Sequence, residues 1–495
     1  MLKVKRYILI TGTLLLLLNF VGVSQSNNPA LPSSTIAETE LTPGGADFKE
    51  KLSSPSNFII AEIVVNGNRK TKPYIIEREL TFKRGDTILL ADLIAKFEYA
   101  RQQLMNTKLF NEVVVALKSF HGYLVDVEIN VKERWYVFPI PYFKPVDRNL
   151  SAWADKNYSF SRVNYGIKLY WDNVSGRNDK IKAWFITGYT HQFQFSYEQP
   201  YADKSLKHGY SISVSHASLK EVNTNTVDNK QVFLKADSID YAGKYLNQMS
   251  SLFLGYYYRP AIRTRHSLLF GLTMNKIDSA VLVANPKYFN NNQTEIFYPE
   301  LTYRLEYTKI DYIPYPLKGF MGEVTLTKKG ITSDMNLLQL TAKATRAWDL
   351  GWKSSYTLNA GGILKLPFDQ PYYNSRMFGY GDFYLRGLEK YVVDGVAGVL
   401  FRNTLRRELL KFNVNLSRSA GSHSNIPFRI FAKTYADAGY SHNKNFPDNS
   451  LVNKMLYTAG AGIDVLTFYD FVFRFEYSVN QLGEKGFFFH VKNDF

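Results

Sequence analysis

The residues best suited to specific chemistry in this chain are one arginine and one aspartate, each in a short glycine-containing motif. Arg386 and Gly387 lie within a glycine-rich segment, residues 378–398, and Asp437 and Gly439 lie in a Tyr-Ala-Asp-Ala-Gly sequence that follows it. A guanidinium and a carboxylate form a two-pronged charged hydrogen bond, which holds a segment in place. Arg386 and Asp437 are the candidates for such a pair. The alternative is a surface-loop arginine and an ordinary turn aspartate.

Residue patterns typical of catalysis do not occur. The chain has no cysteine, which excludes disulfides, a thiol nucleophile and a cysteine-ligated metal. Its eight histidines are dispersed without a metal-ligand motif, and it has no nucleophile elbow, P-loop or dinucleotide fingerprint. We therefore expect no enzyme, no cofactor and no metal site. A serine–histidine site assembled across the strands of a barrel remains the enzymatic alternative.

The net charge of +16 does not indicate nucleic-acid binding. The basic residues are scattered singly among strand-like segments, without the continuous stripe that a phosphate backbone requires. We expect the phosphates of membrane lipids to be the anionic neighbours instead.

Alternating strands must position the arginine and the aspartate. From residue 163 to residue 495, apolar and often aromatic residues alternate with polar ones, for example at Phe471, Phe473, Phe475 and Tyr477. The polar face carries charged residues in mid-strand, as a wet lumen would, and closure into a barrel removes exposed sheet edges. At about 21 residues per strand and connection, the region predicts a membrane barrel of about 16 antiparallel strands. A soluble sandwich or propeller is the competing fold.

Four segments precede this region. Residues 1–24 combine a basic start, an apolar run and a small-x-small cleavage site, which predicts a signal peptide, with a membrane anchor as the alternative. Residues 25–56 read as a flexible tether, and the aromatic and proline-rich residues 134–162 read as a linker. Residues 57–133 predict a β-α-α-β-β domain with a three-stranded sheet. One face of its second helix carries the expected core residues Leu90, Leu93, Ile94, Phe97 and Leu104.

The domain at residues 57–133 resembles a POTRA domain, the periplasmic module of the BamA and TamA outer-membrane assembly proteins. The matching landmarks are Val65-Asn66-Gly67-Asn68, Gly85-Asp86, Phe110-Asn111-Glu112-Val113 and Val131-Lys132-Glu133.

The glycine-rich segment resembles the sixth extracellular loop of the same superfamily. That loop carries a Val-Arg-Gly-aromatic tetrapeptide, and Leu385-Arg386-Gly387-Leu388 stands at its place. The resemblance implies that the loop folds into the lumen, where Arg386 meets Asp437.

The resemblance implies an outer-membrane insertase or translocase that assists assembly or export of polypeptides. Substrate strands would add to a weak seam between the first and last barrel strands, by β-augmentation. The seam residues are expected at Tyr165, Ile167, Leu169, Phe487, Phe489 and Phe495. The free edge of the POTRA-like sheet, which could hold polypeptides, is expected at Val113, Val115 and Leu117.

The expected location is the outer membrane of a Gram-negative bacterium, with the POTRA-like domain in the periplasm. The expected partners are unfolded outer-membrane or exported polypeptides, accessory periplasmic or lipoprotein subunits, and outer-membrane lipid. Two alternatives remain: a dedicated secretion pore for one partner protein, and a passive porin.

Overall fold

The computed structural model describes residues 57–146, 157–238, 244–381, 383–415, 425–444 and 449–492. All of them belong to one compact unit, residues 56–495. The expected signal peptide and tether, and Phe495 of the expected seam, lie outside the described residues. No helix among the described residues is long and apolar enough to cross a membrane.

The first domain is a small α+β fold with a sheet of four strands in the order β2-β1-β4-β3. β1 and β4 are parallel, and the other two pairs are antiparallel. The sequence predicts three strands, and the short β2 is the addition. The elements in chain order are β1 (Asn57–Asn66), α3 (Pro73–Glu77), β2 (Thr87–Leu89), α4 (Leu90–Asn106), β3 (Phe110–His121) and β4 (Leu124–Glu133).

The core of this domain forms where α4 covers the sheet. Leu93, Phe97 and Leu104 are buried at helical spacing against the inward residues of β1 and β4. Leu90 and Ile94 were also expected in the core, but they are 50% and 78% exposed. Leu90 is the first residue of the helix, and Ile94 lies four residues further along the same exposed side, so the apolar stripe is narrower than predicted.

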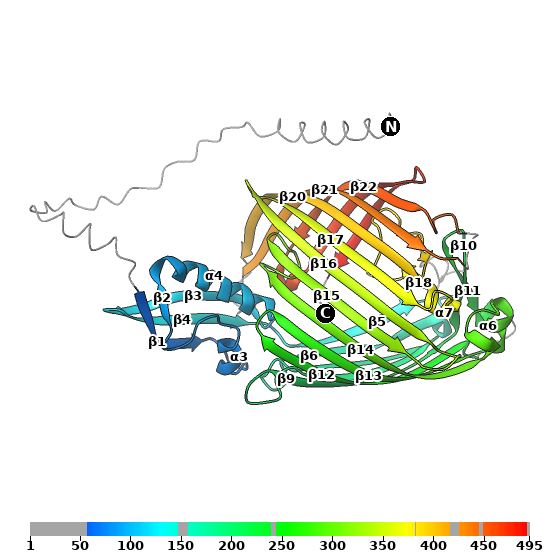
Figure 1. Cartoon of the computed structure of the whole chain (residues 1–495), viewed down its shortest axis with the longest axis horizontal. Coiled ribbons are helices and arrows are strands. Elements are labelled where there is room, and N and C mark those ends of the chain that lie inside the picture. Colours follow the sequence, from blue (N-terminus) through cyan, green and yellow to red (C-terminus); the bar gives the residue numbers. More distant parts are fainter. Residues whose placement is uncertain are drawn as a thin grey trace, which may run out of the picture. The chain divides into compact units, whose positions relative to one another are not determined.

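The second domain is a single sheet of 16 strands, each antiparallel to its neighbours (Figure 1). The prediction of a membrane barrel of about 16 strands behind one α+β domain is confirmed. The strands are β5 (Val137–Pro145), β6 (Val163–Asp172), β7 (Lys180–Gly188), β8 (His191–Gln199), β9 (His208–Leu219), β12 (Asn247–Ala261), β13 (Thr264–Ile277), β14 (Glu295–Ile310), β15 (Gly319–Lys329), β16 (Leu337–Gly351), β17 (Ser354–Leu366), β20 (Ala397–Asn415), β21 (Asn425–His442), β22 (Met455–Leu466), β23 (Val472–Asn480) and β24 (Lys485–Lys492).

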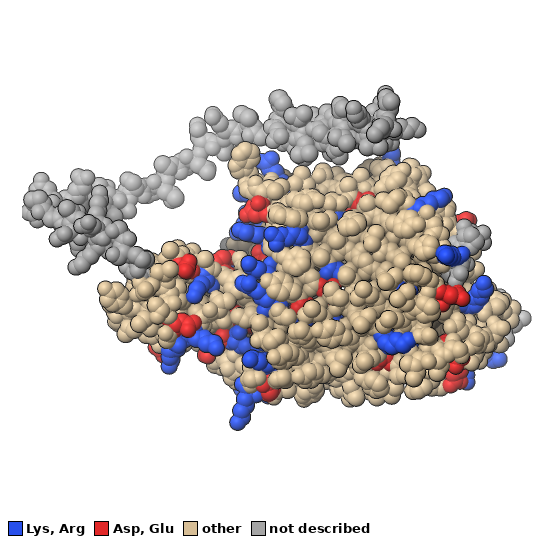
Figure 2. Space-filling model, in the orientation of Figure 1, with Lys and Arg blue, Asp and Glu red and all other residues tan. Residues whose placement is uncertain are grey.

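Apolar side chains cover the outside of this sheet, as lipid requires. On β24, for example, Phe487 and Phe489 are exposed at 66% and 52%, whereas His490 faces the interior. On the face in Figure 2, charged side chains gather on the POTRA-like domain and toward the ends of the strands, and the surface between them is mostly uncharged.

The first strand of the barrel lies in the segment that the sequence analysis assigned to a linker. β5 pairs with β6 from Val137–Trp171 to Pro145–Val163, so the linker boundaries of 134–162 are wrong. β5 carries three prolines, which mask the strand signal, yet proline is tolerated in an edge strand. Residues Tyr165, Ile167 and Leu169 therefore belong to the second strand, which is paired on both sides with β5 and β7.

Short elements connect the strands at both mouths of the barrel. At the outer mouth, the β10–β11 hairpin, α6 and α7 pack around buried residues such as Tyr288 and Tyr372. The connecting elements are η1 (Phe160–Arg162), β10 (Glu221–Val227), β11 (Lys230–Lys235), η2 (Ala236–Ser238), α6 (Ser279–Ala284), η3 (Asn290–Asn292), α7 (Tyr372–Ser375), β18 (Arg376–Phe378), β19 (Val393–Asp394) and η5 (Phe468–Asp470).

Candidate functional site

Arg386 and Asp437 meet in the barrel lumen. Arg386 lies on the segment of residues 383–392, here called the lumen loop, and Asp437 lies on the inward face of β21. Arg386 Nε donates to Asp437 Oδ2 at 2.9 Å, and a terminal guanidinium nitrogen donates to Oδ1 at 2.5 Å. The backbone N–H of Arg386 donates to the same carboxylate at 3.2 Å. The structure thus contains the pair that the resemblance implies.

The rest of the guanidinium is also satisfied. It donates to Thr404 Oγ1 at 3.0 Å and to the carbonyl of Asn403 at 3.3 Å, both on β20. Its Cζ lies 4.0 Å from the ring centre of Tyr435, the aromatic residue of the Asp437 motif. The side chains of Arg386 and Asp437 are 9% and 0% exposed. A buried ion pair stabilises a fold only when further contacts offset its desolvation, and this guanidinium has several such contacts.

Both predicted glycines stand where the loop approaches the wall closely. Gly387 has φ +88°, and a Cβ there would lie 2.8 Å from Cβ of Ser478 on β23. A Cβ at Gly439 would lie 3.1 Å from the carbonyl of Val399 and 3.4 Å from Leu385. Leu385 and Leu388, which flank the arginine and glycine, are buried in the same apolar cluster.

Other strands hold the lumen loop as well. The carbonyl of Tyr384 accepts from Arg402 Nε at 2.7 Å, and the carbonyl of Gly387 accepts from Asn480 Nδ2 at 2.9 Å. Tyr391 donates to Glu484 at 2.7 Å, beside the start of β24. The loop therefore connects β20, β21 and the last two strands.

At the outer mouth, the buried side chain of Asn229 forms hydrogen bonds that the sequence analysis did not predict. Asn229, at the tip of the β10–β11 hairpin, is fully buried. Its side chain donates to the carbonyl of Val392 at the end of the lumen loop and accepts from the backbone N–H of Leu451, which precedes β22. A lone asparagine in a polar turn offers no sequence signal for such long-range contacts.

The inner mouth is occupied by the turn of residues 311–318, which joins β14 to β15. Tyr315 from this turn is 1% exposed and donates to Asp464 at 2.8 Å. Lys433 donates to both Asp464 and Glu476 at 2.5 Å. These charges stand in mid-strand on the inward face, a pattern visible in the sequence, but only the folded sheet brings them together.

The seam of the sheet lies between β5 and β24. The sheet order ends at these two strands, and within the described residues no ladder joins them. Of the expected seam residues, Phe487 and Phe489 lie on β24, whereas the β6 residues lie one strand away from the seam.

Backbone hydrogen bonds show which residues of β5 face its free edge. Tyr136 O accepts from Asp172 N at 2.7 Å, and Val146 N donates to Arg162 O at 2.9 Å, so even-numbered residues face β6. Odd-numbered residues face the opposite edge, and three of the five are Pro139, Pro141 and Pro145. The free edge of β5 therefore lacks three of its five N–H donors.

The POTRA-like sheet offers β3 as an edge, as predicted, since β3 pairs with β4 alone within the described part of the chain. Its residues Val113, Val115 and Leu117 pack against the domain core. Only the backbone of these residues is therefore available at the edge.

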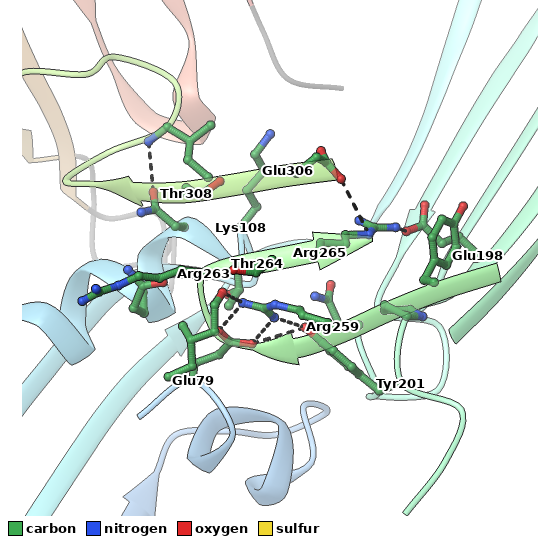
Figure 3. Close-up of a pocket in the computed structure, with 18 of the residues that line it drawn as sticks. Glu79, Lys108, Glu198, Tyr201, Arg259, Arg263, Thr264, Arg265, Glu306 and Thr308 are labelled. Carbon is green, nitrogen blue, oxygen red and sulfur yellow. Dashed lines mark hydrogen bonds and ion pairs between the residues drawn. The ribbon is translucent and has the colours of Figure 1, made fainter. Parts of the chain in front are cut away.

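A charged junction joins the POTRA-like domain to the barrel (Figure 3). Glu79, which follows α3, is buried and accepts from Arg259 of β12 at 2.6 and 2.9 Å and from Tyr201 at 3.2 Å. Burial alone would raise the pKa of Glu79, but Arg259 and Arg78 outweigh burial and hold it below the usual 4.5.

Two further contacts tie the same domain to the inner mouth. Asn106 at the end of α4 bonds to the carbonyl of Ile310 at 3.2 Å and to the N–H of Ile313 at 3.0 Å. Arg134 forms an ion pair with Asp470 of η5 at 2.7 Å. A cavity of about 260 Å³ lies at the junction, lined by both domains.

Comparison with known proteins agrees with this architecture. Residues 173–390 match the model of the Omp85 superfamily domain, and residues 58–134 match a POTRA model described as surface antigen variable number repeat. The search of curated proteins found no match.

The fold is also similar to solved structures. BamA from Haemophilus ducreyi lacking POTRA domains 1–3 is 16% identical, with 88% of this chain and 84% of that chain covered and a TM-score of 0.48. CdiB from Escherichia coli is 11% identical, with 92% and 91% covered and a TM-score of 0.44. CdiB from Acinetobacter baumannii is 13% identical, with 88% and 73% covered and a TM-score of 0.44. On the two family matches, the chain carries a POTRA domain at residues 58–134 and an Omp85 superfamily domain at residues 173–390.

Proposed function

We propose that this protein assists the insertion or export of polypeptides at the outer membrane, by pairing substrate strands with the open edge of its barrel. The Omp85 and POTRA matches support a role in insertion or secretion. The observation that carries the mechanism is the free edge of β5, which lacks three N–H donors.

Because these donors are missing, a β5–β24 pair forms fewer backbone hydrogen bonds than a strand pair without prolines. The seam is therefore weaker than such a pair. Each backbone hydrogen bond contributes about 0.5–1.5 kcal/mol net, and more in lipid, where water cannot replace it. A closed β5–β24 pair is short of three such donors, so the sheet opens there at the lowest cost.

The two sides of the open seam are not equivalent. β24 has no proline, so its free edge presents a full set of donors and acceptors. An unpaired edge in lipid is costly, and an incoming strand that pairs with β24 removes that cost. We therefore assign β24 as the templating edge and β5 as the releasing edge.

Segments of the chain fold into both mouths of the barrel. This arrangement favours a transporter that must open over a passive porin. The lumen loop, Asn229 and Tyr315 occupy the interior between strands that lie far apart in the sheet. The proposal keeps the POTRA-like domain in the periplasm of a Gram-negative cell, where the β3 edge would receive polypeptides or accessory subunits. It requires no enzymatic step and no cofactor.

The test is a disulfide across the seam, which the cysteine-free chain makes unambiguous. One cysteine is placed at Val137 or Phe143, the other at Phe487, Phe489 or Val491, and the pair that oxidises is selected. Proteoliposomes carrying it are given a urea-unfolded outer-membrane barrel, and folding is followed by heat-modifiable gel mobility. Oxidation should abolish assisted folding, and reduction should restore it.

The matched control places the same disulfide between β15 and β16, at Val324 and Ala342, which face each other in the ladder. Equal activity of the oxidised and reduced seam variants would overturn the opening mechanism. Depletion in the native cell then separates the alternatives. Loss of many outer-membrane proteins supports assembly, loss of one exported protein supports secretion, and altered solute uptake alone supports a porin.

A further inference from the structure

The inward face of β24 carries a histidine that lies against two carboxylates. His490 Nε2 is 3.5 Å from Glu389 Oε1 of the lumen loop and 3.6 Å from Glu476 Oε2 of β23. All three atoms lie within 4.8 Å of one another. Residues 389, 476 and 490 come from three different elements, which is why no motif in the sequence marks them.

These three atoms are buried and have no hydrogen-bond partner. The second oxygen of each carboxylate is satisfied: Lys433 donates to Glu476 Oε1 at 2.5 Å, and Gly387 N donates to Glu389 Oε2 at 2.7 Å. The Glu476 side chain is only 2% exposed. Two buried carboxylate oxygens this close together are stabilised by a cation between them or by a shared proton.

We propose that Glu389, Glu476 and His490 bind a divalent transition-metal ion, with Zn²⁺ as the best match. One imidazole nitrogen and two carboxylate oxygens form a donor set that suits zinc, whereas calcium and magnesium prefer oxygen alone. In a tetrahedral site with bonds of about 2.1 Å, ligand atoms lie about 3.4 Å apart. The separations of 3.5 and 3.6 Å are close to this value. The fourth position is left for water.

The ion would join the lumen loop to the last two strands of the barrel. Its ligands tie Glu389, three residues after Arg386, to β23 and to β24, which forms one side of the seam. The bound metal would therefore hold β24 to the loop from the inside. The site is independent of the proposed function, because metal binding is measured without any substrate.

The experiment uses the full chain in detergent micelles, stripped with EDTA and titrated with ZnCl₂ in a calorimeter. Wild type should bind one Zn²⁺ per chain, and zinc should raise its melting temperature. His490→Gln and Glu389→Gln should each weaken binding by at least tenfold and lose the thermal shift. Tetrahedral cobalt bands on Co²⁺ substitution, missing from His490→Gln, would report the same ligands.

The matched control is His216→Gln. His216 lies on β9 and bonds to Ser250 and Ser218, so its loss should leave zinc binding unchanged. Binding as tight in His490→Gln as in wild type would overturn the proposal. Wild type that binds no stoichiometric zinc would overturn it as well.

Discussion

At the scale of single residues, Arg386 has the most consequential contacts. Its guanidinium satisfies Asp437, reaches β20 through Thr404 and Asn403, and stacks on Tyr435. Removing one member of a buried pair leaves the other charged, buried and unpaired, which costs more than the pair itself contributes. The lumen loop should therefore depend on this side chain for its position.

Arg386→Ala should release the lumen loop and lower the free energy of unfolding by about 3–5 kcal/mol, because Asp437 is left unpaired. Hydrogen exchange should show lost protection over residues 383–392, while the protein still reaches the outer membrane. The double variant Arg386→Asp with Asp437→Arg should recover part of the protection.

Arg429→Ala is the control for this change. It breaks the Arg429–Glu408 pair, whose arginine side chain is 35% exposed, and a pair in contact with solvent contributes about 1 kcal/mol or less. If the loop keeps wild-type protection in Arg386→Ala, the pair does not position it.

At the scale of elements, β5 explains the error in the sequence analysis and forms the edge of the sheet at which we propose the weak seam. The prolines that hide the strand from a period-two search stand at positions whose backbone N–H would face away from β6. They therefore leave the hydrogen bonds between β5 and β6 intact. Prolines at the even-numbered positions of β5, which face β6, would remove hydrogen bonds from the β5–β6 ladder.

Pro139→Ala with Pro141→Ala should therefore tighten the seam. The two restored N–H groups add about 1–3 kcal/mol to the closed pair. Assisted folding in proteoliposomes should slow about tenfold, since 1.4 kcal/mol corresponds to a factor of ten. Hydrogen exchange in β5 and β24 should slow as well.

The same substitution at Pro299 serves as the comparison, because Pro299 lies in β14 opposite Leu272 of β13, away from the seam. It should leave the folding rate unchanged. A double β5 variant that assembles substrate at the wild-type rate, with unchanged exchange in β24, would exclude the prolines as the cause of a weak seam.

At the scale of the whole molecule, the POTRA-like domain is connected to the lumen through a few buried contacts. Glu79 pairs with Arg259, Asn106 holds the turn that carries Tyr315, and Arg134 pairs with Asp470. Tyr315 donates a hydrogen bond to Asp464, and Lys433 donates to both Asp464 and Glu476. Glu476 lies on β23, beside β24. Through the backbone between residues 313 and 315, the Asn106 contact thus connects the domain to the last strands.

The Glu79 contact should respond to acid. Its pKa is lowered in the folded protein, so its stabilisation is complete above pH 4.5 and is lost as the pH falls through the lowered value. Hydrogen exchange or limited proteolysis near residue 134 should show the domain released under those conditions. Glu79→Gln should release it already at neutral pH and remove the acid-dependent step.

Glu98→Gln should behave as wild type at neutral pH, because Glu98 has only exposed contacts, with Arg101 and Gln102 of the same helix α4. If wild type and Glu79→Gln release the POTRA-like domain to the same extent at every pH, the Glu79–Arg259 contact does not hold the domain in place.

The sequence alone determined the architecture, because each of its signals is local. Period-two alternation against lipid marks a strand whatever its partner, and the Arg386 and Asp437 motifs indicate a charged pair through their resemblance to the loop and strand motifs of a known superfamily. Only the tertiary structure decided what depends on distant contacts: that β5 is a strand, that the seam lies at its proline edge, and that Glu389, Glu476 and His490 converge. Strand register and packing in the lumen depend on contacts between residues that are tens to hundreds of positions apart in the sequence. No local sequence pattern specifies which of these residues will meet.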